Sequence, residues 1–215
     1  MAYTPQHIAN YFLERAEREG VRVSPLKLIK LVYIAYGWNL ALVGDKLFDE
    51  PIEAWQHGPV IPSIYHEFKE FGSSGINRRA YDLDLETLET YAPQIREDDE
   101  ITRLVLDRVW AAYKRFTGWQ LREKTHEAGS PWSKVFREGA RCVALDDDDI
   151  KAHFAEKIDG YLTAANEIHV RRASRQAQGD QCGRSQRRCC APRGRARRDL
   201  GADLFPTTLQ VLRRH

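Results

Sequence analysis

Residues 25–43 are apolar around nearly the whole circumference of the helix that they predict, which Gly44-Asp45 ends. The segment follows Ser24, a residue that favours the N-cap of a helix, and has proline at its first helical position. Three polar residues interrupt the apolar surface: Lys27, Lys30 and Asn39. Such a helix is stable in water only when other elements cover it, so we expect it at the centre of the fold. The apolar run 31–43 is shorter than the ~20 residues that a membrane span requires.

Four further segments predict helices that can cover the central one. Residues 4–20 combine an N-cap and proline start with apolar residues at helical spacing and a glycine stop. Residues 98–116 predict a second central helix, and residues 119–127 a short one. Over 146–170 the apolar residues recur on one stripe, which predicts an amphipathic C-terminal helix that docks on the body. The sequence therefore predicts a mainly α fold, with a single helical domain over 1–145.

A small β element is predicted after the central helix. The β-like runs 46–48 and 52–56 are separated by turn-forming residues and predict a hairpin or ribbon. Residues 57–62 contain one glycine and two prolines and predict a constrained turn.

The next part of the chain is predicted to be a short helix and a long loop. Residues 63–71 predict the helix, which ends at Gly72. Residues 73–97 are rich in turn formers and charge, and predict a surface loop with one short helix at 85–91.

Charge and aromatic content change sharply near the end of the chain. Residues 1–170 contain 21 Lys and Arg against 28 Asp and Glu, whereas 171–215 contain 12 Arg against three Asp. All five Trp and all nine Tyr precede residue 171. Residues 171–215 therefore predict a disordered, Arg-rich tail. Two interpretations of this tail stay open: a native interaction segment, and an out-of-frame translation of GC-rich DNA.

The N-terminus and the cysteines favour a cytoplasmic protein. The chain runs directly into its first predicted helix, without the charged and apolar regions of a secretory signal. Within 1–170 the cysteine is Cys142, which a reducing compartment keeps as a thiol. We predict no membrane segment and no cofactor.

Three blocks of the sequence carry a family resemblance. Residues 28–38 (LIKLVYIAYGW) and 47–68 (LFDEPIEAWQHGPVIPSIYHEF) resemble the Panacea (SocA-like) domain. A later cluster is similar to the third block of that family: Leu121, Thr125-His126 and Ser130-Pro131-Trp132. The order and spacing of the blocks agree with the family over roughly residues 5–140.

The resemblance implies a mostly α-helical, phage-associated antitoxin that binds a cognate toxin and is not an enzyme. In some members of this family the antitoxin is a proteolytic adaptor, which implies a bacterial AAA+ protease as a second partner. The predicted partner-binding residues, which lie within these blocks, are Trp55, His57, Gly58, Pro59, Tyr65, His126 and Trp132.

Two interpretations of residues 55–59 stay open. In the first, the turn holds Trp55 as a preorganised aromatic surface for a partner. In the second, Trp55 closes the core, and the glycine and proline serve the turn alone. His126 is expected to bond a free carbonyl where the helix 119–127 ends.

Three other functions are alternatives to binding of a toxin. A metal or acid/base site, including a hydrolase built on His126 and His57, would draw on these residues: His57, His66, His126, Glu67 and Glu127. The common catalytic signatures are absent from the sequence. Zinc would require the tail residues Cys182, Cys189, Cys190 and His215, whose spacing fits no usual zinc site. A nucleic-acid-binding regulator would use the tail arginines, and its binding would be weak and nonspecific.

Overall fold

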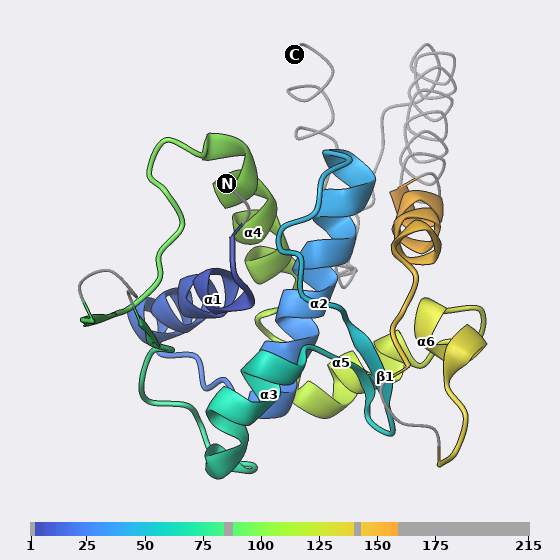
Figure 1. Ribbon diagram of the computed structural model, residues 1–215, viewed down its shortest axis with the longest axis horizontal. Helices are drawn as coiled ribbons and strands as arrows, with labels where there is room; N and C mark the ends of the chain where they lie inside the picture. The colour runs from blue at the N-terminus through green and yellow to red at the C-terminus, as the bar shows by residue number, and fades with distance from the viewer. Residues whose placement is uncertain (1–2, 84–87, 140–142, 159–215) are drawn as a thin grey trace, which may run out of the picture.

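The computed structural model describes residues 3–83, 88–139 and 143–158 of this protein. Their secondary structure, shown in Figure 1, is as follows: α1 (Pro5–Glu19), α2 (Pro25–Leu42), β1 (Glu53–Trp55), β2 (Gly58–Val60), α3 (Pro62–Phe68), the 3-10 helix η1 (Lys69–Phe71), β3 (Asp82–Leu83), β4 (Thr90–Tyr91), α4 (Glu100–Tyr113), α5 (Gly118–Thr125) and α6 (Pro131–Val135). A further helix covers residues 147–158. The predicted mainly α fold with a small β element is confirmed.

Helix α2 lies at the centre of the molecule, as predicted, with α1, α3, α4 and α5 packed around it (Figure 1). Fifteen of its 18 residues are buried. Its three polar residues are accommodated because each donates a hydrogen bond to a backbone carbonyl oxygen: Lys27 to Lys114 (2.6 Å), Lys30 to Pro59 (2.8 Å) and Asn39 to Asp45 (2.8 Å). The central helix therefore contacts strand β2 and two turns as well as filling the core.

The first hairpin differs from the predicted one. Strand β1 pairs antiparallel with β2, with Trp55 opposite Gly58, so Gln56 and His57 form the turn. The predicted pairing of 46–48 with 52–56 was wrong, because Leu47 and Phe48 are buried in the core, and the predicted turn at 57–62 is a strand over its first part.

The other edge of β1 is paired with a segment from much later in the chain. The Ala54 N–H donates to the Val143 carbonyl oxygen (2.8 Å), and the Leu145 N–H donates to the Ile52 carbonyl oxygen (2.7 Å). The β element is therefore a hairpin whose first strand lies between β2 and residues 143–145.

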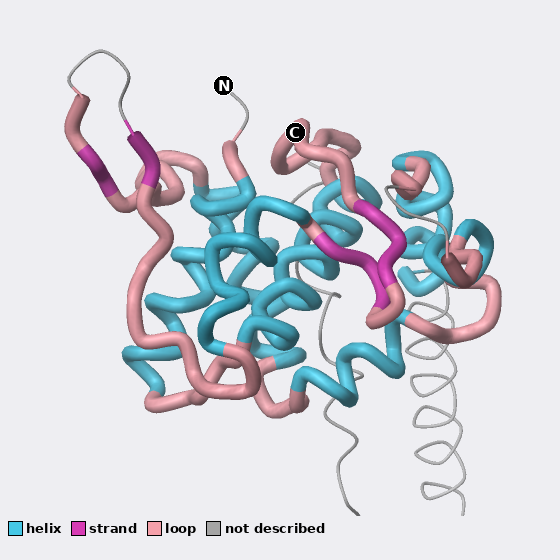
Figure 2. Tube along the Cα trace, turned by 60° about the horizontal axis from the view of Figure 1, so that its bottom comes forward, coloured by secondary structure: helices cyan, strands magenta, loops and turns pink. Residues whose placement is uncertain are grey.

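A second antiparallel hairpin, β3 with β4, lies within the predicted loop 73–97. The short helix predicted at 85–91 was wrong at its end, since Thr90 and Tyr91 are in a strand; residues 84–87 lie outside the described part. The hairpin extends away from the helices in both views of the molecule (Figures 1 and 2).

The helix 147–158 confirms the apolar stripe expected near the C-terminus. Ile150, Phe154 and Ile158 are buried, and the Phe154 ring lies against Gly37 and Trp38 of α2. The remainder of the predicted C-terminal helix, the tail 171–215 and Cys142 lie outside the described residues. None of the described helices is long and apolar enough to cross a membrane.

Candidate functional site

The turn of the first hairpin meets the C-terminal end of α5 and the start of α6. Gly58 lies at the meeting point, with φ of 96° and no space for a side chain: a Cβ atom there would lie 2.7 Å from Lys30 Nζ and 2.8 Å from His126 Cε1. Only glycine fits both the backbone angle and the space. This close approach brings His57 and His126, far apart in the sequence, to one region of the molecule.

His126 lies at the C-terminal end of α5, as the sequence predicts. Its Nδ1 is 2.7 Å from the Arg122 carbonyl oxygen. This carbonyl is not free as expected, because it also accepts hydrogen bonds from the His126 backbone N–H (3.1 Å) and the Thr125 hydroxyl (2.8 Å). Its Nε2 lies 3.4 Å from the Gln56 carbonyl oxygen in the hairpin turn. Burial lowers the pKa of His126. The contacts with the Arg122 and Gln56 carbonyl oxygens oppose this effect, and the charges of Arg122 and Lys30 add to it. A neutral imidazole carries one N–H, so it donates to one of these two carbonyl oxygens, and the contact of Nδ1 with Arg122 is the shorter of the two.

Two tryptophans complete the link between the hairpin and α6. The indole N–H of Trp132 donates to the Trp55 backbone carbonyl oxygen (2.7 Å), and the Trp132 ring centroid is 3.8 Å from that of His126. The indole N–H of Trp55 donates to Glu53 (2.7 Å), and its ring packs edge-on against Tyr65 of α3 at 4.8 Å. Trp55, Tyr65, His126 and Trp132 therefore belong to one connected cluster.

The exposed part of this cluster is aromatic. Trp55, Tyr65, His126 and Trp132 are half-buried, whereas His57 is exposed and its ring meets that of Trp119 at 5.8 Å. Trp119 is 59% exposed. We call these residues the aromatic site: Trp55, His57, Tyr65, Trp119, His126 and Trp132. Gly58 and Pro59 are buried, so of the predicted partner-binding residues these two could act only by shaping the backbone.

A buried lysine contacts the hairpin of the aromatic site from the side of the core. Lys30 is fully buried, and its ammonium donates to the Pro59 carbonyl oxygen. Its desolvation, together with the charge of Arg122, holds its pKa well below the ordinary value. Because Pro59 has no N–H to donate, its carbonyl is the group through which the core can hold this strand.

Sequence reasoning missed Trp119, Lys30 and Glu53. Trp119 could have been found, because it lies off the helix face that Leu121 and Thr125 bury, and an off-face tryptophan is an exposed one. Lys30 was noted as an interruption of the apolar helix, but its partner lies 29 residues away and has no sequence signal.

The residues considered for a metal or acid/base site are dispersed. Glu67 is paired with Arg78, and Glu127 with Lys157. Among the described residues no group of three or more His, Cys, Asp or Glu side chains is arranged to hold a metal ion. His57 and His126 line none of the three principal cavities. The alternative zinc ligands of the tail lie outside the described residues.

Fold and site together define a small helical domain with a rigid aromatic surface. The sequence model of the family described as antitoxin SocA-like, Panacea domain, matches residues 28–133, which contain the whole aromatic site. The chain is 33% identical over 129 residues to the protein named antitoxin SocA from Caulobacter vibrioides (strain NA1000 / CB15N), covering 60% of this chain and 68% of that protein. No solved structure matches it. The chain belongs to the SocA-like Panacea domain family.

Proposed function

We propose that this chain is the antitoxin of a bacterial toxin–antitoxin pair, and that it neutralises a cognate toxin in the cytoplasm by direct binding, without catalysis. Membership of the SocA-like family supports the antitoxin role. The observation that carries direct binding is the aromatic site: an exposed tryptophan and histidine, next to half-buried aromatic rings on a backbone held from several sides.

The aromatic site has the properties of a binding hot spot. Hot spots are rich in tryptophan and tyrosine, and they bind tightly because little conformational freedom is lost on association. Here the Trp132 indole N–H, the His126 ring and the Lys30 ammonium each contact the hairpin backbone. A partner would therefore meet rings whose supporting backbone is already ordered.

The charge of the body favours a basic partner. Residues 1–170 carry an excess of Asp and Glu over Lys and Arg, 28 against 21. A toxin that acts on nucleic acid or on the translation machinery has a basic surface for its target, and an acidic antitoxin would attract it and compete for that surface.

A further part of the proposal is that this chain delivers the bound toxin to a bacterial AAA+ protease. An adaptor must bind two proteins at once, so the protease would use a surface outside the aromatic site. Degradation of the toxin by a purified protease, present only when this chain is added, would support this step.

Trp55→Ala tests the aromatic site directly. The variant should fold, because the Trp132 indole bonds to the backbone carbonyl of residue 55, which alanine retains. Affinity for the toxin should fall by ~2 kcal/mol or more, as for a central aromatic anchor. His57→Ala should cost less. The measurement is calorimetry with the product of the adjacent reading frame, with circular dichroism of each variant.

The control is Ile101→Ala, which removes an exposed apolar side chain at the start of α4, away from the aromatic site. It should leave the affinity unchanged. An unfolded Trp55→Ala protein would favour the packing interpretation of Trp55. A folded one with full affinity would place the toxin-binding surface away from Trp55, first around His126 and Trp132 at the other side of the aromatic site.

A further inference from the structure

The second hairpin carries most of the exposed apolar surface of the described chain. Of six exposed large hydrophobic residues, four lie there: Tyr81 (56% exposed), Leu83 (46%), Leu88 (74%) and Tyr91 (45%). We call the described residues 81–83 and 88–91 the ribbon arm. It lies on the far side of the molecule from β1 and α6 (Figures 1 and 2).

The ribbon arm presents apolar side chains on both of its faces. Leu83 is opposite Thr90, and Asp82 is opposite Tyr91, so the pleat places Leu83 on one face and Tyr91 on the other. All of these residues except Asp82 are exposed. A two-stranded ribbon that is open on both faces gains little stability alone, so its apolar residues are not explained by the fold.

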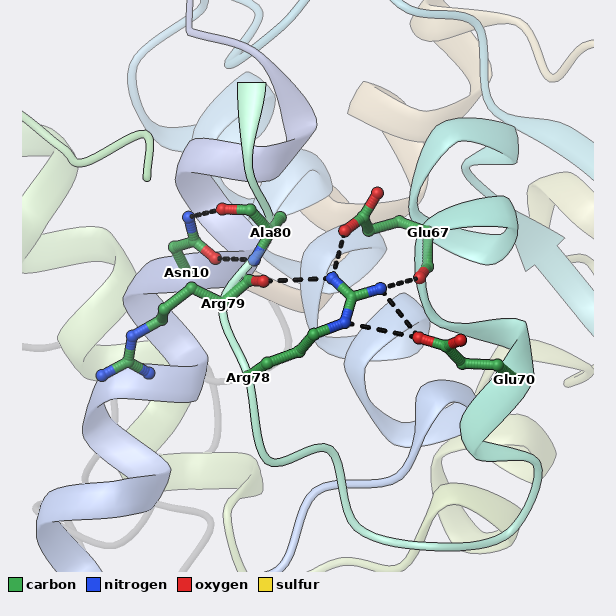
Figure 3. Close-up of polar contacts among 6 residues, drawn as sticks. All are labelled: Asn10, Glu67, Glu70, Arg78, Arg79 and Ala80. Atoms are coloured by element: carbon green, nitrogen blue, oxygen red, sulfur yellow. Dashed lines mark hydrogen bonds and ion pairs between the residues drawn. The ribbon is translucent and has the colours of Figure 1, made fainter. Parts of the chain in front are cut away.

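By contrast, the base of the arm is firmly anchored. The buried side chain of Asn10 in α1 accepts a hydrogen bond from the Ala80 N–H (2.7 Å), and donates to the carbonyl oxygens of Ala80 (2.9 Å) and Pro93 (3.0 Å). Asn10 thus holds both ends of the arm. Just before it, the Arg78 guanidinium lies between Glu67 and Glu70 (Figure 3). The arm is therefore presented from a fixed base.

Leu88 adds an independent observation. It has φ of 58°, and among the described residues it is the one non-glycine residue with positive φ. Such a conformation costs leucine roughly 1–2 kcal/mol, and its side chain is 74% exposed. A leucine that is both strained and exposed is a candidate for contact with a partner.

The charge of this segment restricts the partner. The charged residues of the ribbon arm are both acidic: Asp82 and Glu89. Within the described part, β3 and β4 pair only with each other, so each has an outer edge open to another strand. A second copy of the arm would bring like charges together. A basic, extended chain would be attracted by the acidic residues and could pair with the open strand edge.

We propose that the ribbon arm is a docking element for a basic, extended segment of a partner protein, which pairs with an open strand edge and covers the arm's apolar side chains. The proposal goes beyond the toxin-binding role of the aromatic site, because it concerns a separate surface and does not depend on which protein supplies the segment.

The test uses the full chain and two labelled peptides of equal length, one of alternating Lys and Val and one of alternating Glu and Val. We expect the Lys–Val peptide to bind, measured by fluorescence anisotropy, with an affinity that decreases as salt is added. Hydrogen exchange should slow at residues 81–83 and 88–91. The Glu–Val peptide should not bind.

Two variants locate the binding. The double variant Leu83→Ser, Tyr91→Ser should bind the Lys–Val peptide at least about tenfold more weakly. The variant should fold normally, because both side chains are exposed. Ile101→Ser, the matched change of an exposed apolar residue outside the arm, should have no effect. Equal binding by the double variant, or equal binding of both peptides, would overturn the proposal. Trp55→Ala should bind the peptide with the affinity of the unaltered protein. The proposal for the aromatic site and the proposal for the arm can therefore be contradicted separately.

Discussion

The absence of a side chain at Gly58 allows Lys30 of the core and His126 of the aromatic site to pack against the hairpin. The Gly58 φ of 96° is almost the same as that of Gly44, 95°. The surroundings differ: a Cβ atom at Gly58 would meet Lys30 and His126, whereas one at Gly44 would meet nothing within 4 Å. The two glycines therefore separate backbone strain from steric crowding.

We predict that Gly44→Ala costs about 1–2 kcal/mol of unfolding free energy, from backbone strain alone. Gly58→Ala should cost at least about 1 kcal/mol more, because Lys30 and His126 must move. Urea unfolding of both variants measures the difference. Equal losses would mean that the space around Gly58 adapts without cost.

His7 makes the start of α1 sensitive to pH. Its Nδ1 accepts a hydrogen bond from the Thr4 N–H (3.2 Å) at the first turn of the helix. Burial lowers its pKa below the ordinary 6.5, against an opposing effect of Asp82. The folded protein thus takes up the proton less readily than the unfolded chain, so the His7 contribution is complete above about pH 6.5 and is lost as the pH falls below it.

We predict that the urea midpoint decreases between pH 7 and pH 5, and decreases less in His7→Gln. A glutamine at this position can accept the same hydrogen bond as part of a capping box, and it does not titrate. His126 and His153 also have pKa values lowered by burial, so part of the decrease should remain in the variant. An unchanged pH profile would show that His7 does not contribute.

At the scale of elements, helices could be predicted and strand pairing could not. Helix starts depend on local residues: Ser24 accepts a hydrogen bond from the Lys27 N–H, as its sequence position predicts. The partner of β1 depends on which neighbouring segment is buried in the core and which remains available to pair. Residues 46–48 have suitable β propensity, but burial of Leu47 and Phe48 takes them into the core, and β2 pairs instead.

Gly37 and Phe154 together dock the helix 147–158. A side chain at Gly37 would overlap the Phe154 ring, so we predict that Gly37→Ala costs ~1–3 kcal/mol and speeds hydrogen exchange over 147–158. In a Phe154→Ala background the same change should stabilise α2 by up to ~1 kcal/mol, because alanine favours helix over glycine.

This reversal of sign distinguishes docking from a general effect on α2. A double-mutant cycle with urea unfolding measures it. If Gly37→Ala destabilises both backgrounds equally, the Phe154 ring is not what occupies the space beside Gly37.

For the whole molecule, the apolar surface of α2 was enough to predict its central position. A helix that is apolar on all sides must be covered by other elements on all sides. The residues of the aromatic site were mostly named in advance on the family resemblance, and the structure brings them together; their binding role stays a prediction. Their contacts could not be predicted, since Trp55 and Trp132 lie 77 residues apart.

The tail gives the prediction at this scale. We expect truncation after Val170 to leave folding and toxin neutralisation intact, because residues 171–215 contain few residues of the kind that proteins bury. Thermal melting and co-expression with the toxin measure both properties. A melting temperature lower by ~5 °C or more would mean that the tail packs on the body. A salt-sensitive shift of DNA that disappears on truncation would instead support a nucleic-acid-binding role.

The pairing of β1 with residues 143–145 has a consequence for synthesis on the ribosome. Ala54 emerges long before Val143, its hydrogen-bond partner. At the usual rate of translation the interval is roughly 5–20 s. During that time the strand that carries Trp55 has one edge without its final neighbour. A newly made chain therefore completes this part of its structure only when nearly all of the folded domain has been translated.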